Sequence, residues 1–470
     1  MLRDRGRSSL PKSISVRSTR SKIAPFLLGL SVSTGVIYAL TIGNTPVYVG
    51  YFVAALLLVA LLIRNSKLVI SAVSAIDSSI LVFFGIAALS ISFSLAYCMA
   101  GLLSLDAPIM VVKGLFILAA GIAIYVAGVT QRKNSGAIFC GVAVGIVANA
   151  VISFAAQMAY DSGSVLSLIS FFPQDSFVVP LKWGTPEPVG SHAIYVFRAQ
   201  GLFLEASHLM VFLVTWGVLC IANLRSILMR ALVLVCVCYM AAEALSPNIA
   251  VLILEVALAL LFSRAGKLKK RQRTTDKVIP YSTIIAFLVL MFIGSLVLIS
   301  FGSAISDAAS AAMESLTDLN PFTSTDTGTT ERFDSMMSAL SALPNYPLGS
   351  GWNTESLALM SCSNGTVYAS HSFALRLLIE LGPLGLATYC WVIFRHTKGA
   401  FQSSKHGRFV AAAIVCMAIA QFMNGITLLP YVWLILGVAR GFELDRQEAF
   451  EAKVSTKRKS LGEKDLERSC

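Results

Sequence analysis

Residues 108–129 have the sequence PIMVVKGLFILAAGIAIYVAGV, in which Lys113 is the single charged side chain. As an α-helix, a run of this length crosses the ~30 Å hydrocarbon core of a membrane. Comparable runs recur along the chain, where 56% of all residues are hydrophobic and 13% are charged. This composition excludes an ordinary soluble domain and predicts an all-α polytopic membrane protein.

Twelve apolar runs qualify as membrane-spanning helices. They lie near residues 23–41, 46–63, 79–98, 108–129, 136–159, 202–222, 227–245, 247–263, 279–301, 371–394, 409–427 and 428–440. The predicted transmembrane domain covers residues 23–441. It follows a basic segment, residues 1–22, and precedes a charged tail, residues 442–470, which we expect to be a frayed helix or disordered.

The basic residues are distributed unequally across this arrangement. With the N-terminus in the cytoplasm, 32 of the 37 Lys and Arg residues fall in the N-terminal segment, the inner loops and the tail. This is the positive-inside pattern, and it predicts that both termini are cytoplasmic. These side chains lie beside anionic lipid headgroups, so the net charge of +12 does not require a nucleic-acid partner.

Two predicted outer loops are long, residues 160–200 and 302–370. Loops of this length are commonly functional or disordered. The five basic residues not on the inner side lie in these loops or within spans: Lys113, Lys182, Arg198, Arg332 and Arg376.

Arg198 and Arg332 are candidates for binding an anionic substrate. Arg332 is the single basic residue of the second outer loop, which holds seven acidic ones, and Arg198 stands at the outer entrance to the sixth predicted span. A guanidinium group matches phosphate in both charge and geometry. The alternative is structural: Arg332 pairs at the surface with Glu331 or Asp334, and Arg198 is an ordinary interfacial arginine.

Glu205 and His371 are candidates for proton transfer. Glu205 lies in the first turns of an apolar span, where an acid is a functional candidate by default, although it could also pair with Arg198 or bond to His208. His371 opens the span at residues 371–394, and histidine is the commonest general base. A lone histidine at a helix start is also commonly structural.

Arg376 and Glu380 lie further along the same span as His371. Their i, i+4 spacing predicts a mutually neutralising pair with a mainly structural role. On the outer side, no metal-ligand spacing, phosphate-binding glycine loop or Ser-His-Asp pattern rises above background. We therefore expect neither a metal nor a cofactor.

Two segments carry a resemblance to a known family. Residues 197–207, FRAQGLFLEAS, resemble the R-x-x-G-x-F-x-E-P-S signature of bacterial polysaccharide polymerases. Residues 331–385 contain Arg332, PLGSG at 347–351, His371 and ELGPLG at 380–385. This order is similar to the R…P-x-G-x-G…H-N-x-x-L…E-x-G-x-x-G stretch of the O-antigen ligase and polymerase superfamily.

The predicted topology also resembles that superfamily, with about twelve spans and a main outer loop between spans nine and ten. Two positions depart from the motifs. Ala206 stands where the family has proline, and Ser372 stands where it has asparagine. Neither change removes a proposed catalytic side chain, but Ser372 follows His371 directly and bears on its orientation.

The resemblance implies a metal-independent glycosyltransferase at the outer face of the bacterial inner membrane. Its donor would be a glycan on a polyprenyl diphosphate, most simply undecaprenyl diphosphate. Arg198 and Arg332 would stabilise the diphosphate leaving group, His371 would take the proton from the attacking hydroxyl, and Glu205 would orient the acceptor or act as an alternate base. Membrane lipids are implied partners, and chain-length regulators and flippases are candidate protein partners.

Three functions are compatible with these features. The motif around Glu205 favours a polymerase that joins repeat units of O-antigen, capsule or exopolysaccharide. A ligase that transfers the finished glycan to lipid A–core is the first alternative. A twelve-helix secondary transporter or flippase is the second, with helix breaks at Ser246-Pro247 and Gly382-Pro383 as its candidate sites.

Overall fold

A computed structural model describes most of the chain. The described residues are 22–35, 37–42, 45–162, 166–167, 182–183, 187–189, 194–196, 198–203, 205–244, 246, 248–271, 327–363, 369–425 and 428–469. Within these ranges, side chains are described except at residues 38–47, 166–196, 265–271, 327–333 and 457–469.

The described part of the chain is a multi-pass helical bundle. Seven of its helices are long and apolar enough to cross a membrane: α2 (Val49–Ser74), α3 (Ser78–Met99), α4 (Ala107–Thr130), α5 (Ser135–Asp161), α6 (Ala206–Asn223), α13 (Phe373–Ser403) and α14 (Lys405–Met423).

Three more helices coincide with predicted spans: α7 (Ile227–Glu243), α8 (Asn248–Arg271) and α15 (Pro430–Ser469). The predicted span at 279–301 lies outside the described residues. Twelve spans therefore remain a prediction. For the tail, where a frayed helix or disorder was expected, α15 continues through residues 442–469 as a helix.

The first predicted span, residues 23–41, is wrong in its second half. Helix α1 (Ile23–Ser31) ends in a 3-10 turn, Val32–Thr34, and a two-stranded hairpin follows, formed by β1 (Tyr38–Ile42) and β2 (Thr45–Tyr48). Gly35 has a φ of +58°, a backbone conformation that side chains disfavour and that ends the helical path. The apolar run is thus divided between a short helix and a strand.

The segment between the predicted spans 46–63 and 79–98 is not a loop from residue 64 onward, because α2 continues to Ser74 with a kink. Asn65 leaves helical geometry at φ −157° and ψ 72°. Its side-chain Oδ1 then accepts a hydrogen bond from Leu68 N at 3.3 Å, which caps the second helical segment. Helix α2 therefore consists of two helical segments that meet at a kink at Asn65.

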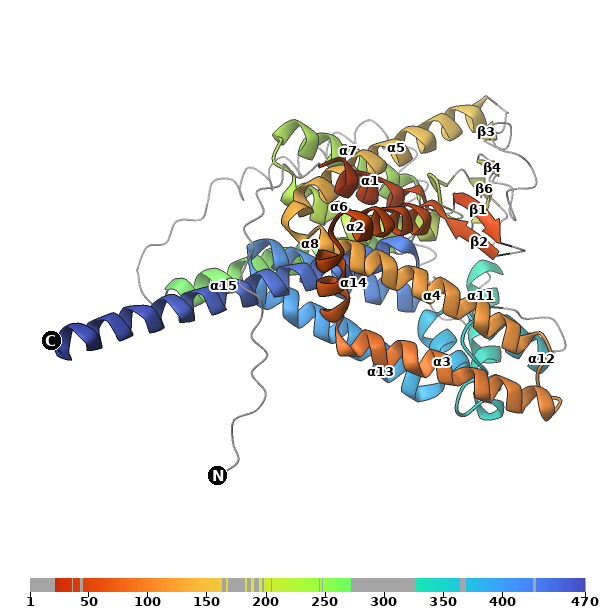
Figure 1. The fold of residues 1–470 in the computed structure, drawn as a ribbon. Coiled ribbons are helices and arrows are strands. Elements are labelled where there is room, and N and C mark those ends of the chain that lie inside the picture. The colour runs from red at the N-terminus through yellow and green to blue at the C-terminus, as the bar shows by residue number, and fades with distance from the viewer. Residues whose placement is uncertain are drawn as a thin grey trace.

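The two ends of the bundle differ. Hairpins β3–β4 (Leu166–Ser167 with Lys182–Trp183) and β5–β6 (Glu187–Val189 with Ile194–Val196) lie toward the same end as α11 (Thr327–Ala342) and α12 (Glu355–Cys362) (Figure 1). The C-terminal part of α15 extends from the opposite end (Figure 1). Segments of both predicted outer loops are thus gathered at one end.

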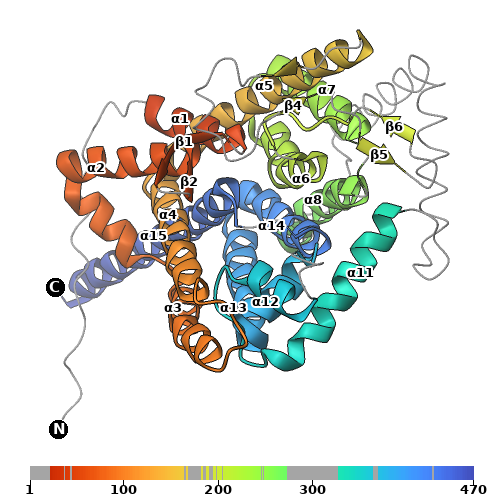
Figure 2. The same cartoon turned by 90° about the vertical axis from the view of Figure 1, so that its right-hand side faces the viewer.

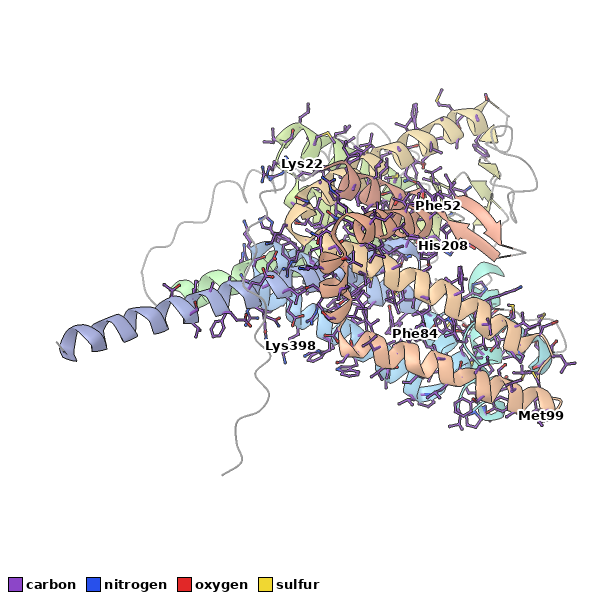
Figure 3. All side chains as sticks on the ribbon, in the orientation of Figure 1. Lys22, Phe52, Phe84, Met99, His208 and Lys398 are labelled. Carbon is purple, nitrogen blue, oxygen red and sulfur yellow. The ribbon has the colours of Figure 1, made fainter. Side chains whose placement is uncertain are left out.

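Helices α14 and α15 occupy the middle of the bundle (Figure 2). Helix α14 packs against α6, α8 and α13, while α15 packs against α4. Apolar side chains on the peripheral helices stay exposed, among them Phe52 on α2 and Met99 on α3 (Figure 3). An apolar exterior of this kind suits contact with lipid.

Ion pairs join three helices at the end opposite the hairpins. Asp77 caps α3 by accepting a hydrogen bond from Ser79 N at 3.0 Å. The same carboxylate pairs with Arg395 of α13 at 3.2 Å and with Arg440 of α15 at 3.8 Å. Both arginines belong to the basic residues predicted on the inner side, so this end is the candidate cytoplasmic end.

We expect that Gly141→Val will destabilise the bundle by about 1 to 3 kcal/mol, through overpacking. Gly141 of α5 faces α1 so closely that an added Cβ would collide with the carbonyl oxygen of Phe26. Thermal unfolding of the purified protein in detergent measures the change. Gly136→Val is the matched control, because a Cβ at Gly136 meets nothing within 4 Å. Equal unfolding temperatures for the two variants would contradict this packing.

Candidate active site

Helix α13 is broken at Gly382, and this break organises the site. Gly382 has a φ of +67°, and Pro383 follows it. Proline has no N–H, so the carbonyl of Ile379 loses its helical partner, and the non-helical turn also frees the carbonyl of Glu380. Inside a membrane protein such groups must find other donors.

The segment Gly349–Gly351 supplies these donors. Ser350 N donates to Ile379 O at 2.7 Å, and Gly351 N donates to Glu380 O at 2.9 Å. Gly349 has a φ of +93°, and a Cβ there would lie 2.5 Å from Glu380 O. The P-x-G-x-G segment and the E-x-G-P segment of the sequence are therefore two halves of one backbone junction.

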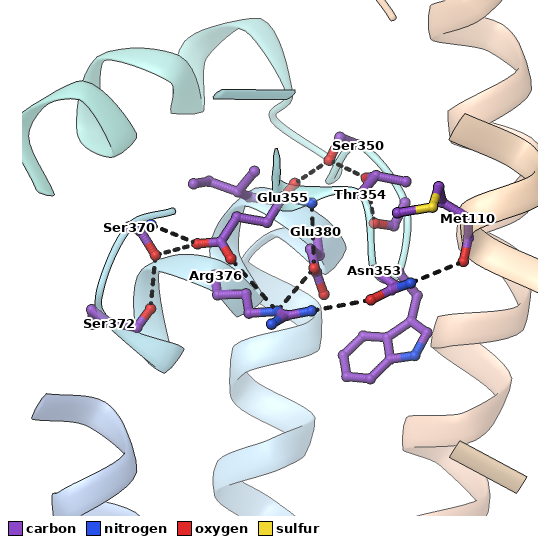
Figure 4. Close-up of polar contacts among 12 residues, drawn as sticks. Met110, Ser350, Asn353, Thr354, Glu355, Ser370, Ser372, Arg376 and Glu380 are labelled. Atoms are coloured by element: carbon purple, nitrogen blue, oxygen red, sulfur yellow. Dashed lines mark hydrogen bonds and ion pairs between the residues drawn. The ribbon is translucent and has the colours of Figure 1, made fainter. Parts of the chain in front are cut away.

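A buried charged cluster lies beside this junction (Figure 4). Arg376 Nε donates to Glu380 Oε1 at 3.0 Å, which confirms the pair predicted from i, i+4 spacing. Glu355 is a second carboxylate, with its Oε2 3.7 Å from Arg376 Nε. Arg376 Nη2 also donates to Asn353 Oδ1 at 3.3 Å. One guanidinium thus faces two carboxyl groups. Both of these acids, Glu380 and Glu355, are largely buried.

His371 is held in an unusual backbone conformation next to this cluster. Among the described residues, His371 and Asn353 are the two non-glycine residues with positive φ, at 52° and 65°. Such a conformation costs about 1 to 3 kcal/mol and commonly marks a functional site. The Cα of His371 lies 3.2 Å from where a Cβ on Gly425 would be, so Gly425 allows this close approach.

Ser370 precedes His371 but does not cap α13. Its backbone N donates to Glu355 Oε1 at 2.9 Å, and its hydroxyl group contacts the same carboxylate oxygen. The N-cap position of α13 belongs to Ser372, whose hydroxyl donates to Phe422 O at 2.9 Å. The family's asparagine position is thus filled by a serine that ties the turn to α14.

Glu205 and His371, the two residues predicted to transfer protons, line one cavity of about 160 Å³. The cavity opens between the starts of α6 and α13 and the end of α14. Its other described lining residues are Ser207, His208, Glu355, Ala369, Met423, Asn424 and Gly425. Both Glu205 and His371 are exposed, so their side chains are accessible to a ligand.

Glu205 is the N-cap residue of α6, and its Oε2 accepts a hydrogen bond from Ser207 Oγ at 2.9 Å. Residues 201 and 202, in the motif that precedes Glu205, are hydrogen-bonded to side chains of α5. Gly201 N donates to Ser153 Oγ at 3.1 Å, and Leu202 N donates to Asn149 Oδ1 at 2.7 Å. These bonds hold the chain that leads into Glu205.

Arg198 lies at the start of the same segment, outside the described lining of the cavity. Its Nε donates to Ala244 O at 3.0 Å, just beyond the C-terminal end of α7. Arg332 belongs to helix α11 by its backbone, but its side chain lies outside the described residues. The structure thus places Glu205 and His371 in one cavity. That Arg198 and Arg332 also bind the substrate there stays a prediction.

Sequence reasoning missed Glu355 as a site residue. It is one of seven acidic residues in the second outer loop, and nothing in its local pattern separates it from the others. Its burial and its contacts with Ser370 and Arg376, 15 and 21 positions away, appear only in the folded chain. Within the described residues, no group of three or more His, Cys, Asp or Glu side chains is arranged to hold a metal ion.

Part of the chain matches a known protein family. Residues 230–390 match the family model described as O-Antigen ligase, and this range contains the backbone junction, the charged cluster and His371. No curated protein matches the chain. Members of the matched family are glycosyltransferase-like enzymes that act on lipid-linked glycans in membranes. This match, over 161 of the 470 residues, supports the resemblance to the O-antigen ligase and polymerase superfamily.

Proposed function

We propose that the protein is a polymerase of lipid-linked oligosaccharide repeat units at the outer face of the bacterial inner membrane. It would transfer a glycan from polyprenyl diphosphate to a hydroxyl group of the next unit. The observation that carries the proposal is the cavity shared by Glu205 and His371. The end of the bundle that gathers segments of the long predicted outer loops supports the sidedness (Figure 1).

The charges of the cavity favour the acceptor over the diphosphate. Its described lining includes the carboxylates Glu205 and Glu355 and no lysine or arginine. A diphosphate would be repelled there, whereas a sugar hydroxyl can donate to a carboxylate or an imidazole. The diphosphate is therefore assigned to Arg198 and Arg332, outside the described lining.

The proposed step is a direct glycosyl transfer. The acceptor hydroxyl oxygen bonds to the anomeric carbon of the donor sugar, and the bond from that carbon to the diphosphate oxygen breaks. The diphosphate leaves with the electron pair, and Arg198 and Arg332 stabilise its charge. His371 takes the hydroxyl proton, while Glu205 orients the acceptor.

The helix break at Gly382-Pro383 does not favour a transporter. In a transporter, the free carbonyls of a broken helix bind the substrate or ion. Here the carbonyls of Ile379 and Glu380 accept hydrogen bonds from Ser350 and Gly351 of the same chain. The break therefore serves to attach the loop that carries the site.

Surface polysaccharide from a deletion strain tests this function. The strain is complemented with wild type, Glu205→Gln or His406→Ala, an exposed histidine near the opposite end of the bundle. We expect a ladder of polymer lengths with wild type and His406→Ala, and single repeat units with Glu205→Gln. Full-length glycan that remains on the polyprenyl carrier without reaching lipid A–core would identify a ligase instead. Unchanged glycan in the deletion strain would reject both.

A further inference from the structure

Glu355 joins the charged cluster to the cavity. Its side chain is 10% exposed, and it lines the cavity together with His371. One carboxylate oxygen accepts from Ser370 N at 2.9 Å and contacts the Ser370 hydroxyl, while the other faces Arg376. The backbone N of Glu355 itself donates to Glu380 Oε1 at 3.3 Å. The carboxylate is thus fixed on both sides.

The contact between Glu355 and Ser370 constrains the backbone next to His371. Ser370 precedes His371, whose φ of 52° is disfavoured for a residue with a side chain. A conformation of this kind persists only where surrounding contacts enforce it. Of the described contacts, those from Glu355 to Ser370 hold this turn on the side of the second outer loop, and Ser372 holds it on the side of α14.

The cluster holds the Glu355 side chain from a second direction. Arg376 faces the carboxyl groups of both Glu355 and Glu380, so it fixes Glu355 on the side away from Ser370. The other titratable groups lining the cavity are Glu205 and His208 of α6, and the end of α14 contributes the non-titrating Met423, Asn424 and Gly425.

We propose that Glu355 is a positioning residue for His371: it fixes the turn that presents the imidazole to the cavity. This inference rests on the proposed function, in which His371 is the general base. It assigns a role to a carboxylate that the reaction scheme above does not use.

The test uses the full-length protein in liposomes with a polyprenyl-diphosphate-linked repeat unit as the substrate. Glu355→Gln keeps the shape of the side chain and removes its charge. We expect kcat to fall by at least about 10-fold, with KM within about 2-fold of wild type because substrate contacts remain. An amide nitrogen cannot accept a hydrogen bond, so glutamine can accept from Ser370 or from Arg376 but not from both.

Two further variants separate charge from geometry. Glu355→Asp keeps the charge but shortens the reach to Ser370, so kcat should fall even though the carboxylate is kept. Glu380→Gln changes the same cluster without touching Ser370 or the cavity. It should lower the unfolding temperature but leave kcat near that of wild type. A purely structural role would make Glu355→Gln behave like Glu380→Gln.

Ser370→Ala keeps the test decisive if Glu355→Gln does not fold. It removes the hydroxyl contact with Glu355 and the hydrogen bond from that hydroxyl to Ser372 O, and we expect kcat to fall several-fold while the protein stays folded. A wild-type kcat in Glu355→Gln, or in Ser370→Ala where the former is unfolded, would overturn the inference. Failure of the wild-type protein to elongate the glycan would instead reject the proposed function.

Discussion

Replacement of His371 by Ala is expected to lower the rate of glycan elongation by about 10²- to 10⁴-fold, the range that a general base contributes. His371 is exposed to the cavity and held at a φ of 52° by contacts around it. The loss should appear in kcat, because the proton is transferred in the transition state. Elongation of a lipid-linked repeat unit by the purified protein measures the effect.

His406→Ala is the control for this variant. His406 is exposed at the start of α14, the end of that helix opposite the cavity, and we expect its rate to match that of wild type. Thermal unfolding should show that His371→Ala is folded, since removal of an exposed side chain leaves no buried group unpaired. A wild-type rate for folded His371→Ala would show that another group takes the proton.

Replacement of Arg376 by Met is expected to destabilise the protein by about 3 to 5 kcal/mol. Arg376 is the described partner of two largely buried carboxylates, Glu380 at 3.0 Å and Glu355 at 3.7 Å. Without the guanidinium, both acids would be buried without a counter-charge. Unfolding of the purified protein in detergent measures the loss.

The triple variant Arg376→Met, Glu355→Gln, Glu380→Gln should recover part of this stability, because it leaves no unpaired charge. Arg225→Met serves as the control, since Arg225 is exposed in the turn between α6 and α7. It should change stability by no more than about 0.5 kcal/mol. If Arg376→Met and Arg225→Met unfolded at the same temperature, the cluster would not hold the site together.

Much of the bundle follows from apolar runs bounded by polar residues. Helices α3 and α4 begin and end within one residue of the predicted ranges 79–98 and 108–129. Asp77 and Arg132 lie just outside these two helices, so the edges of the runs are sharp. Single-sequence patterns suffice where length and polarity agree.

The same reasoning failed where a local turn overrode the apolar pattern. Gly35 divides the run at residues 23–41 into a helix and a strand, because its positive φ ends the helix. No charged residue marks this turn, since Ser31, Ser33 and Thr34 before it are uncharged and residues 36–37 after it are apolar. The segment after residue 63 likewise differs from the prediction: it is helical with a kink at Asn65, whose side chain caps the second helical segment.

The site was predictable only in part. Glu205 and His371 were identified from their place at the start of spans, and the structure gives them a common cavity. The pair Arg376–Glu380 follows from helical spacing. Glu355 could not be found this way, because its partners are distant in the sequence and its own surroundings are rich in acidic residues. The contacts of Glu355 depend on the break in α13, because Ser350 and Gly351 of the second outer loop are hydrogen-bonded to the backbone at that break.

The most direct test of the account is elongation in a purified system. Wild type, Glu205→Gln and His371→Gln are each reconstituted with polyprenyl-diphosphate-linked repeat units, and the glycan on each carrier is measured by mass spectrometry. The account predicts that wild type produces carriers with two or more repeat units and releases polyprenyl diphosphate, whereas both variants leave single units. Elongation by the two variants at the wild-type rate would contradict the assignment of this cavity as the active site.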